Sequence, residues 1–154
     1  MSRIKKILLG LLIVFIAIQF IQPARNKNGQ VLATDISKMV SLPQGVQTIL
    51  KTACYDCHSN NTNYPWYTNV QPVGWMMVRH IKEGKEELNF SEFGSYSERR
   101  QLSKLRSIEN SIKDGSMPIS SYTIIHKNAR LTKEEKAQII DWAKITRDSL
   151  ANKN

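Results

Sequence analysis

The sequence predicts a small all-α domain that follows an apolar N-terminal helix. Three observations support this fold class. Apolar residues recur at helical spacing in several segments, no segment shows a confident strand pattern, and a continuous apolar run occupies residues 7–21. The chain has 154 residues, enough for one domain and a leading segment. With 41% hydrophobic and 23% charged residues, its composition is that of an ordinary globular protein.

The net charge is +9, from 22 basic and 13 acidic residues. Part of this excess flanks the apolar run, at Arg3, Lys5, Lys6 and Arg25. The rest is spread through the chain without interleaved aromatic residues, so we expect no nucleic-acid binding. A dispersed positive charge is typical of a solvated surface, and it can steer docking to an acidic partner.

Residues 1–22 are predicted to form a signal anchor, that is, a transmembrane helix that is not removed. Basic residues followed by an apolar run have the layout of a secretory signal. The bulky stretch 20–23 offers no small-residue cleavage site, which favours retention over cleavage to a soluble periplasmic form. The run is short, because 15 helical residues rise about 22 Å against a bilayer core of about 30 Å. Basic side chains that snorkel at its ends would make up the difference.

Residues 23–40 are predicted to be a tether, because they include the polar, turn-forming stretch 26–29. The domain is expected over 41–150. Its first helix begins near Pro43 and leads directly to Cys54. Three apolar residues of this helix share one face by their spacing: Val46, Ile49 and Leu50.

Three further helices are expected in the domain. The second runs over 73–88, and the third runs over 97–114 and stops at Gly115. The last begins with the capping box Thr132 to Glu135. Its predicted buried side consists of Ala137, Ile140, Trp142, Ala143 and Ile145. The basic residues of the third helix, Arg99, Arg100, Lys104 and Arg106, are predicted to form a solvated face.

The motif with the most chemical information is Cys54-Tyr55-Asp56-Cys57-His58. Cys-x-x-Cys-His is the attachment signature of c-type haem. Two thiols at this spacing can form thioether bonds to one porphyrin, and the adjacent histidine can then bind the iron. Because such attachment takes place outside the bacterial cytoplasm, the motif also favours a periplasmic location for the domain.

Three other roles for the two cysteines are weaker. Structural zinc needs four ligands, and no second cysteine pair exists. A redox dithiol belongs near a βαβ unit, whereas the flanking sequence is predicted to be helix and loop. A structural disulfide across two residues would constrain very little of the unfolded chain.

Aromatic residues follow the motif within a predicted loop over 59–72. Tyr64, Trp66 and Tyr67 could pack against the haem and offer O–H or N–H groups to a propionate, or they could simply fill the core.

The second axial ligand has two main candidates. Met117 lies beside Pro118 in a turn-rich loop late in the chain, and a thioether is an established haem ligand. His80 shares a helix face with Met76 and Met77 and is the alternative. His126 and an open site are the remaining possibilities. We favour Met117.

The order of these features resembles that of a class I-like cytochrome c: a first helix, the Cys-x-x-Cys-His motif, intervening helices, a Met-Pro loop and a last helix. More closely, the chain is similar to the bacterial haem-binding domain family of small membrane-anchored proteins, over roughly residues 40–147. The matching residues are 54–67, the segment from His80 to Ser91, 115–118, Tyr122, His126, Ala129 and Trp142. The insert between His58 and Met117 is longer than in compact cytochromes.

The resemblance implies a cytochrome c-like helical fold around one covalent haem c, with Cys54 and Cys57 as attachment sites and His58 as the proximal ligand. Met117 matches the cytochrome methionine, and His80 matches a histidine of the narrower family, so both stay open. With both axial positions filled, we expect a monohaem cytochrome that transfers electrons on the periplasmic side of the inner membrane, an electron carrier more than an enzyme. Its expected partners are exported or membrane redox proteins.

The alternative function is a haem-based peroxidase, or a gas or redox sensor, with a displaceable distal ligand.

Overall fold

A computed structural model describes residues 2–152 of the chain. Within these residues the fold is all-α, as predicted, and the one β-type pairing is an isolated bridge between Lys27 and Asn61. The α-helices are α1 (Arg3–Ile18), α2 (Ile36–Met39), α3 (Gln44–Ala53), α4 (Tyr55–His58), α5 (Val73–Glu87), α6 (Glu98–Asp114), α7 (Ser120–Ile125) and α8 (Lys133–Ala151). Three 3-10 turns join them: η1 (Trp66–Asn69), η2 (Phe90–Ser95) and η3 (Lys127–Ala129).

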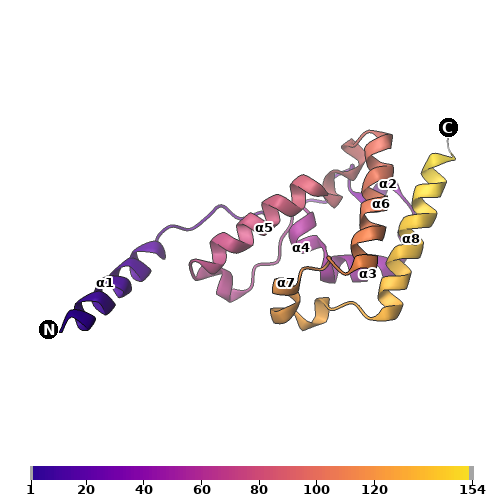
Figure 1. The fold of residues 1–154 in the computed structure, drawn as a ribbon. Coiled ribbons are helices and arrows are strands. Elements are labelled where there is room, and N and C mark those ends of the chain that lie inside the picture. Colours follow the sequence, from indigo (N-terminus) through magenta and orange to yellow (C-terminus); the bar gives the residue numbers. More distant parts are fainter. Residues whose placement is uncertain (1, 153–154) are drawn as a thin grey trace.

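Helix α1 projects away from the other helices and is connected to them by an extended segment (Figure 1). It is 16 residues long and none of its residues is buried. In the described part of the chain, no helix combines the length and the apolar character needed to cross a membrane. The predicted membrane-spanning helix is therefore not supported, because 16 helical residues rise about 24 Å and a bilayer core is about 30 Å thick.

The segment 23–40, predicted to be a tether, packs on the domain at several points. Asn26 donates its side-chain N–H to the Ser59 carbonyl oxygen at 2.7 Å, and its own Oδ1 accepts from Lys85 Nζ at 2.8 Å. Further along, Asp35 caps α2, and Ile36 is fully buried in the core. This segment therefore contributes to the core and to the support of the loop after α4.

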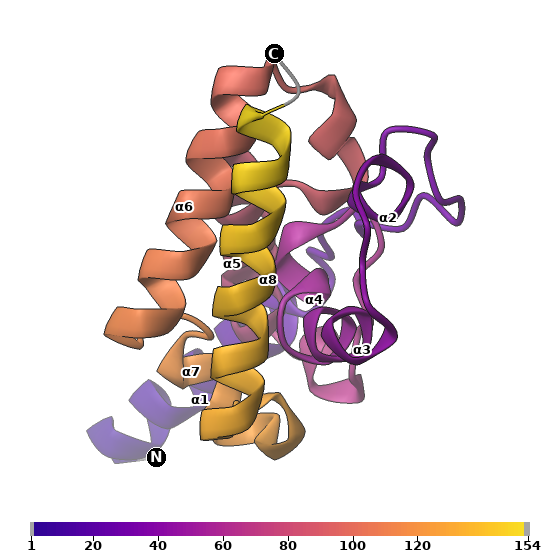
Figure 2. The same cartoon turned by 90° about the vertical axis from the view of Figure 1, so that its right-hand side faces the viewer.

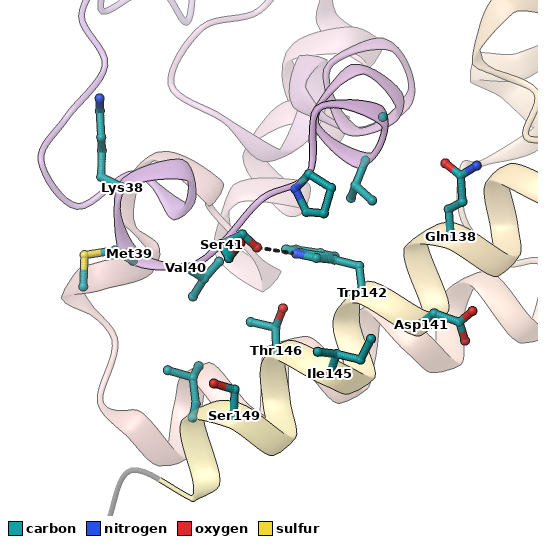
Figure 3. Close-up of a pocket in the computed structure, with 14 residues that line it drawn as sticks. Lys38, Met39, Val40, Ser41, Gln138, Asp141, Trp142, Ile145, Thr146 and Ser149 are labelled. Carbon is teal, nitrogen blue, oxygen red and sulfur yellow. Dashed lines mark hydrogen bonds between the residues drawn. The ribbon is translucent and has the colours of Figure 1, made fainter.

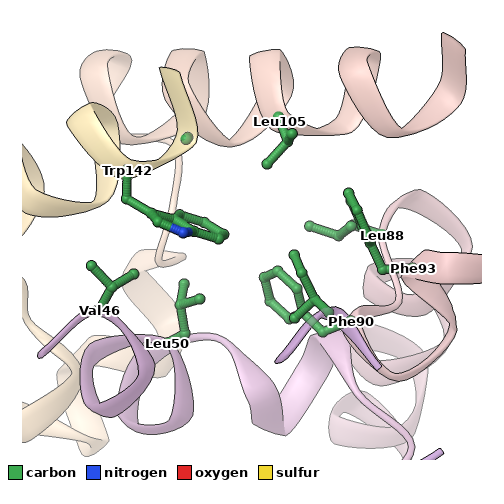
Figure 4. Close-up of a cluster of buried hydrophobic side chains, with 9 residues drawn as sticks. Val46, Leu50, Leu88, Phe90, Phe93, Leu105 and Trp142 are labelled. Carbon is green, nitrogen blue, oxygen red and sulfur yellow. The ribbon is translucent and has the colours of Figure 1, made fainter. Parts of the chain in front are cut away.

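The main core lies where α3, η2, α6 and α8 converge (Figure 4). Val46 and Leu50 contribute the buried face of α3, as their spacing predicts, and Ile49 joins a smaller neighbouring cluster. Burial of apolar side chains is the main favourable contribution to such a fold. The cluster comprises Ile36, Val46, Leu50, Leu88, Phe90, Phe93, Leu105, Trp142 and Ala143.

Helices α6 and α8 run antiparallel and side by side (Figure 2). Gly115 ends α6 in the left-handed conformation, with φ 75°, as its position predicts. The predicted capping box begins α8 and is present in full. Trp142 Nε1 donates to the Ser41 carbonyl oxygen at 3.0 Å, which fixes α8 to the chain before α3.

The buried side of α8 differs from the prediction. It consists of Ile139, Trp142, Ala143 and Thr146, whereas Ile145 is 68% exposed and Ala137 is also exposed. Several apolar residues surround this helix, so more than one helical phase fits the sequence. The packing partner α6 selects the phase that buries Trp142.

Glu109 of α6 forms the charged link between the two long helices. Its carboxylate accepts hydrogen bonds from Lys113 Nζ on the same helix and from Arg147 Nη1 on α8, the latter at 2.7 Å. The hydrogen bond from Lys113, with the neighbouring positive charges, lowers the pKa of Glu109 below its usual range.

Replacement of Glu109 by glutamine should lower the melting temperature at pH 7 and have a smaller effect near pH 3. A carboxylate whose pKa is lowered by folding contributes stability above its unfolded pKa of about 4.3, and this contribution is lost as pH falls through the folded pKa. Thermal unfolding followed by circular dichroism at both pH values checks this. Asp141→Asn, an exposed change on α8, is the control. An equal loss at both pH values would contradict the assignment.

Candidate functional site

The two cysteines lie where α3 passes into the single turn α4. Cys54 ends α3, and its carbonyl oxygen accepts the N–H groups of Cys57 and His58 at 3.2 and 2.9 Å. This turn places residues three apart on one side of the chain, so both thiols reach the same cavity. Both cysteines are free and partly exposed.

His58 is held in one orientation by the end of α5. Its Nδ1 lies 2.9 Å from the Leu88 carbonyl oxygen. A carbonyl oxygen can only accept, so Nδ1 carries the proton and the Nε2 lone pair is left for a metal. Burial lowers the pKa of His58, against the opposing effects of the Leu88 and Gly84 carbonyls and of Glu87, and this favours the neutral ring that binds metals. A backbone carbonyl on the second ring nitrogen is the usual support of a metal-binding histidine.

Buried polar groups hold the chain that follows His58. Asn60 Nδ2 donates to Glu92 Oε1 at 2.9 Å, and Asn89 Nδ2 donates to Asn60 Oδ1 at 2.9 Å. The Asn60 N–H donates to Ser91 Oγ at 3.1 Å. These bonds join the loop after α4 to η2, which keeps His58 close to Leu88.

Three cavities adjoin the cysteine segment in the described part of the chain. Cavity A has a volume of about 280 Å³ and is lined by both cysteines, by His58 and by residues of α5 and of the loop before α7. Cavity B, also about 280 Å³, lies towards α6 and is lined by Cys54, His58 and mainly apolar side chains. Cavity C, about 90 Å³, lies towards α7 and is lined by Cys57. Cavities A and B adjoin, because Cys54, His58 and Met117 line both. Together they offer a mostly apolar space, beside two thiols and an oriented imidazole, for a flat ligand such as a haem.

The thiols themselves are not poised for redox chemistry. Burial raises the pKa of Cys54 to about 12, and the neighbouring Cys57 adds to this effect. Burial and the charge of Asp56 raise the pKa of Cys57 to about 11. Redox dithiols have lowered pKa values, so these neutral thiols argue against that role.

The candidate distal ligands lie around the same cavities. Met117 lines both cavity A and cavity B, in each case together with His58, and its side chain is 37% exposed. His80 of α5 lines cavities A and C. Met76 and Met77 line cavity C with it, as their shared helix face predicts. Of cavities A, B and C, His126 lines only cavity C.

The structure separates the three aromatic residues after the motif. Tyr67, on η1, lines cavity C beside Cys57. Trp66 is 78% exposed. Tyr64 accepts a hydrogen bond from the Asn26 backbone N–H at 2.8 Å and packs its ring under the Arg25 guanidinium. Neither Tyr64 nor Trp66 lines cavity A, B or C.

A chain of polar contacts connects the segment 54–58 to α7. Tyr122 donates its hydroxyl to Asp56 Oδ2 at 2.7 Å and stacks on His126, with ring centroids 4.1 Å apart. His126 Nε2 in turn contacts the Tyr67 hydroxyl. Burial and the Asp56 carboxylate raise the pKa of Tyr122, so its hydroxyl stays protonated as a donor. The sequence pattern did not reveal this pairing, because Asp56 and Tyr122 are far apart in the chain.

Gly84 is a second residue that the sequence reasoning missed, although a glycine inside a helical pattern lowers helix propensity and can mark a packing contact. A methyl group at this position of α5 would lie 2.8 Å from the Cys57 carbonyl oxygen. The bare helix surface at Gly84 therefore lets α5 lie directly against α4.

Substitution of Gly84 by alanine should destabilise the fold by about 1–3 kcal/mol, because backbone atoms of α4 must move to admit the methyl group. Alanine is otherwise the better helix former by about 1 kcal/mol, so helix propensity alone would make the alanine variant more stable. A lower stability would therefore be due to the close approach. Denaturant unfolding measures the change. Gly45→Ala in α3 is the control, since its methyl group would meet the flexible end of Gln138 at 3.4 Å. A Gly84→Ala variant as stable as wild type would show that α5 and the Cys57 backbone leave room for a methyl group.

Lys104 corrects another expectation. It was predicted on the solvated face of α6, but its side chain is 17% exposed and lines cavity B with Ile108 and Ser111. Residues 104, 108 and 111 follow one another at helical spacing, so all three face the same side. Arg99, Arg100 and Arg106 are exposed, as predicted.

A larger cavity, of about 640 Å³, lies elsewhere, between α8 and the chain that joins α2 to α3 (Figure 3). Ser41, Trp142 and Thr146 line it, together with the exposed Ile145. No cysteine or histidine is among its lining residues, so cavities A and B are the better candidate site.

One comparison with known proteins shows the family of the chain. A family model described as a haem-binding domain matches residues 13–145, from the middle of α1 to within α8. No curated protein and no solved structure matches the chain. Since the matched region includes most of the sequence and every wall of cavities A, B and C, the chain belongs to the haem-binding domain family.

Proposed function

We propose that this haem protein is a monohaem c-type cytochrome that carries electrons outside the cytoplasm. The observation that supports this most directly is the arrangement around cavity A: two free thiols and an imidazole with its Nδ1 committed to the Leu88 carbonyl border one apolar space. Cys54 and Cys57 would hold haem c covalently, and His58 Nε2 would bind its iron. The bound group would supply one-electron chemistry between Fe(III) and Fe(II).

The chain's own residues would provide a rigid, mostly apolar enclosure. Phe90 packs edge-on against His58 at a centroid distance of 6.2 Å and lines cavity B. Burial in apolar surroundings and the identity of the ligands are the main means by which a protein sets a haem potential. The Leu88 carbonyl would make the imidazole a better electron donor to the metal.

Met117 is the proposed distal ligand, because it borders both cavities that His58 borders, whereas His80 borders one of them. A thioether at this position would raise the reduction potential relative to two histidines. His80 is the alternative ligand.

For location, we propose export to the periplasm with the domain held near the membrane. The apolar side chains of α1 are exposed and follow three basic residues, which supports a role as an export signal. The same exposed side chains favour association with an apolar phase. Exported or membrane redox proteins would be the electron donor and acceptor.

A second candidate function has one observation in its favour. The contact between Tyr67 and His126 places acid–base groups on cavity C, next to Cys57 and His80. Polar distal groups of this kind are used by haem proteins that activate or sense small ligands. This alternative requires a displaceable distal ligand.

Absorption spectroscopy and mass spectrometry of the protein exported by a bacterium that matures c-type cytochromes test the proposal. We expect the added mass of one haem, a sharp low-spin α-band on reduction, and the weak near-infrared band of a Met ligand. A colourless protein without added mass would exclude the cytochrome. Rapid binding of carbon monoxide or turnover of peroxide would instead favour the second candidate.

A further inference from the structure

Lys104 is an unusual lining residue for an apolar cavity. Its side chain is 17% exposed, and cavity B around it is formed largely by Leu50, Leu88, Phe90, Ile108, Ile112 and Ile139. Removing an ammonium group from water is costly unless a charged or hydrogen-bonding partner compensates for it.

The partner that the structure provides is weak. Lys104 Nζ lies 3.7 Å from Glu87 Oε2, beyond ordinary hydrogen-bond length, and the Glu87 side chain is 84% exposed. An exposed carboxylate at this distance is screened by solvent, so it adds little to an ion pair with Lys104. The site therefore has a positive charge that a better-buried anion would stabilise.

We propose that Lys104 binds a carboxylate of the haem, a propionate, at the α6 side of cavity B. Cavity B also contains Cys54, His58 and Met117, so the lysine shares one space with a thioether site and both proposed axial ligands. A haem is a flat apolar ring with carboxylates at one edge. Cavity B has mostly apolar walls, and Lys104 lines it on the α6 side, with Glu87 as the one carboxylate among its lining residues. The inference rests on the proposed haem c site and adds the residue that orients the group within it.

The expected consequence is electrostatic. An opposite charge within about 4–6 Å lowers the pKa of a carboxylic acid by about 1–3 units, so Lys104 would keep the propionate ionised. It would also offset the negative charge that an ionised propionate places near the iron. The other titratable groups on cavity B are Cys54, His58 and Glu87, and cavity A adds Cys57, His80, Glu83 and Tyr122.

Spectroelectrochemical titration of the haem-loaded protein across pH tests this, with Lys104→Met compared with wild type. In a plot of reduction potential against pH, the ionisation of the propionate gives a step. In Lys104→Met we expect this step at a pH about one unit or more higher than in wild type, and a lower potential at pH values above it. The propionate bending band in resonance Raman spectra should shift as well. Lys104→Arg, which keeps the charge, should retain the wild-type profile.

The matched control is Arg106→Met, which removes one positive charge from the exposed side of the same helix. It should leave the titration unchanged. Lys104→Gln carries the same test if the methionine variant is not recovered.

The same comparison in protein that carries Glu87→Gln shows whether the carboxylate that Lys104 binds belongs to the haem or to Glu87. If Lys104 binds a propionate, Lys104→Met shifts the titration in this background too. If the only partner of Lys104 is Glu87, Lys104→Met leaves the titration in this background unchanged, as Arg106→Met does, and the proposal is wrong. Failure of the proposed function has a different signature, since wild-type protein would then carry no covalent haem at all.

Discussion

Replacement of both Cys54 and Cys57 by serine is expected to abolish covalent haem attachment. Serine hydroxyls do not form the thioether bonds that the two thiols can form, so the exported chain should have its unmodified mass. Each single replacement should leave at most one bond and greatly lower the yield of haem-containing protein. Mass spectrometry and haem staining after denaturing electrophoresis measure the outcome.

Tyr55→Phe is the matched control for the cysteine variants. It changes one of the two residues between the cysteines and keeps the ring that stacks on Phe90 at a centroid distance of 5.1 Å. It should retain the full haem mass. Covalent haem on the double serine variant would show that attachment uses another group, and the assignment of both cysteines would then fail.

Replacement of Met117 by alanine should convert the haem from low spin to a form with an open sixth position. The near-infrared band of the thioether should disappear, and carbon monoxide should bind readily. The reduction potential should fall by a substantial part of the roughly 0.8 V range that axial ligands control. Since the Met117 side chain is 37% exposed, its truncation should leave the core intact, and circular dichroism checks this.

His80→Ala is the comparison that decides between the two distal candidates. If Met117 is the ligand, the histidine variant keeps the low-spin spectrum and the near-infrared band. A low-spin spectrum that survives in Met117→Ala and is lost in His80→Ala would assign the iron to His80 instead. The two variants therefore give opposite results for the two assignments.

Long helices were predictable from the sequence, and short ones were not. The helices that contain Val46 and Leu105 repeat their apolar residues over several turns, and Gly115 and the Thr132 capping box mark clear ends. Helix α7 and the turn that begins at Trp66 are too brief for periodicity to register. Contacts with the rest of the fold hold them: η1 packs on α5, and Tyr122 of α7 donates its hydroxyl to Asp56 of α4.

The candidate site was predictable only in its local part. Cys54, Cys57 and His58 form one continuous motif, whose chemistry depends on spacing within a single turn. The roles of Leu88 and Gly84 depend on how α5 packs against that turn, and the role of Lys104 depends on how α6 packs on α8. The lone glycine in the α5 pattern does not say what lies against it, and no local pattern records the other two roles. The same packing places Tyr67 on a cavity wall and leaves Trp66 exposed, although the two residues are adjacent.

The sequence by itself determined the helical class, the two thiols with their histidine, and the caps that begin and end the long helices. These features depend on residues within about one or two helical turns of one another, and steric and hydrogen-bonding rules act directly at that range. Only the tertiary structure decided which carbonyl orients His58, where a glycine must lie, and that one lysine of α6 faces the cavity. Those outcomes follow from the phase and position of packed helices, which the burial of distant side chains selects.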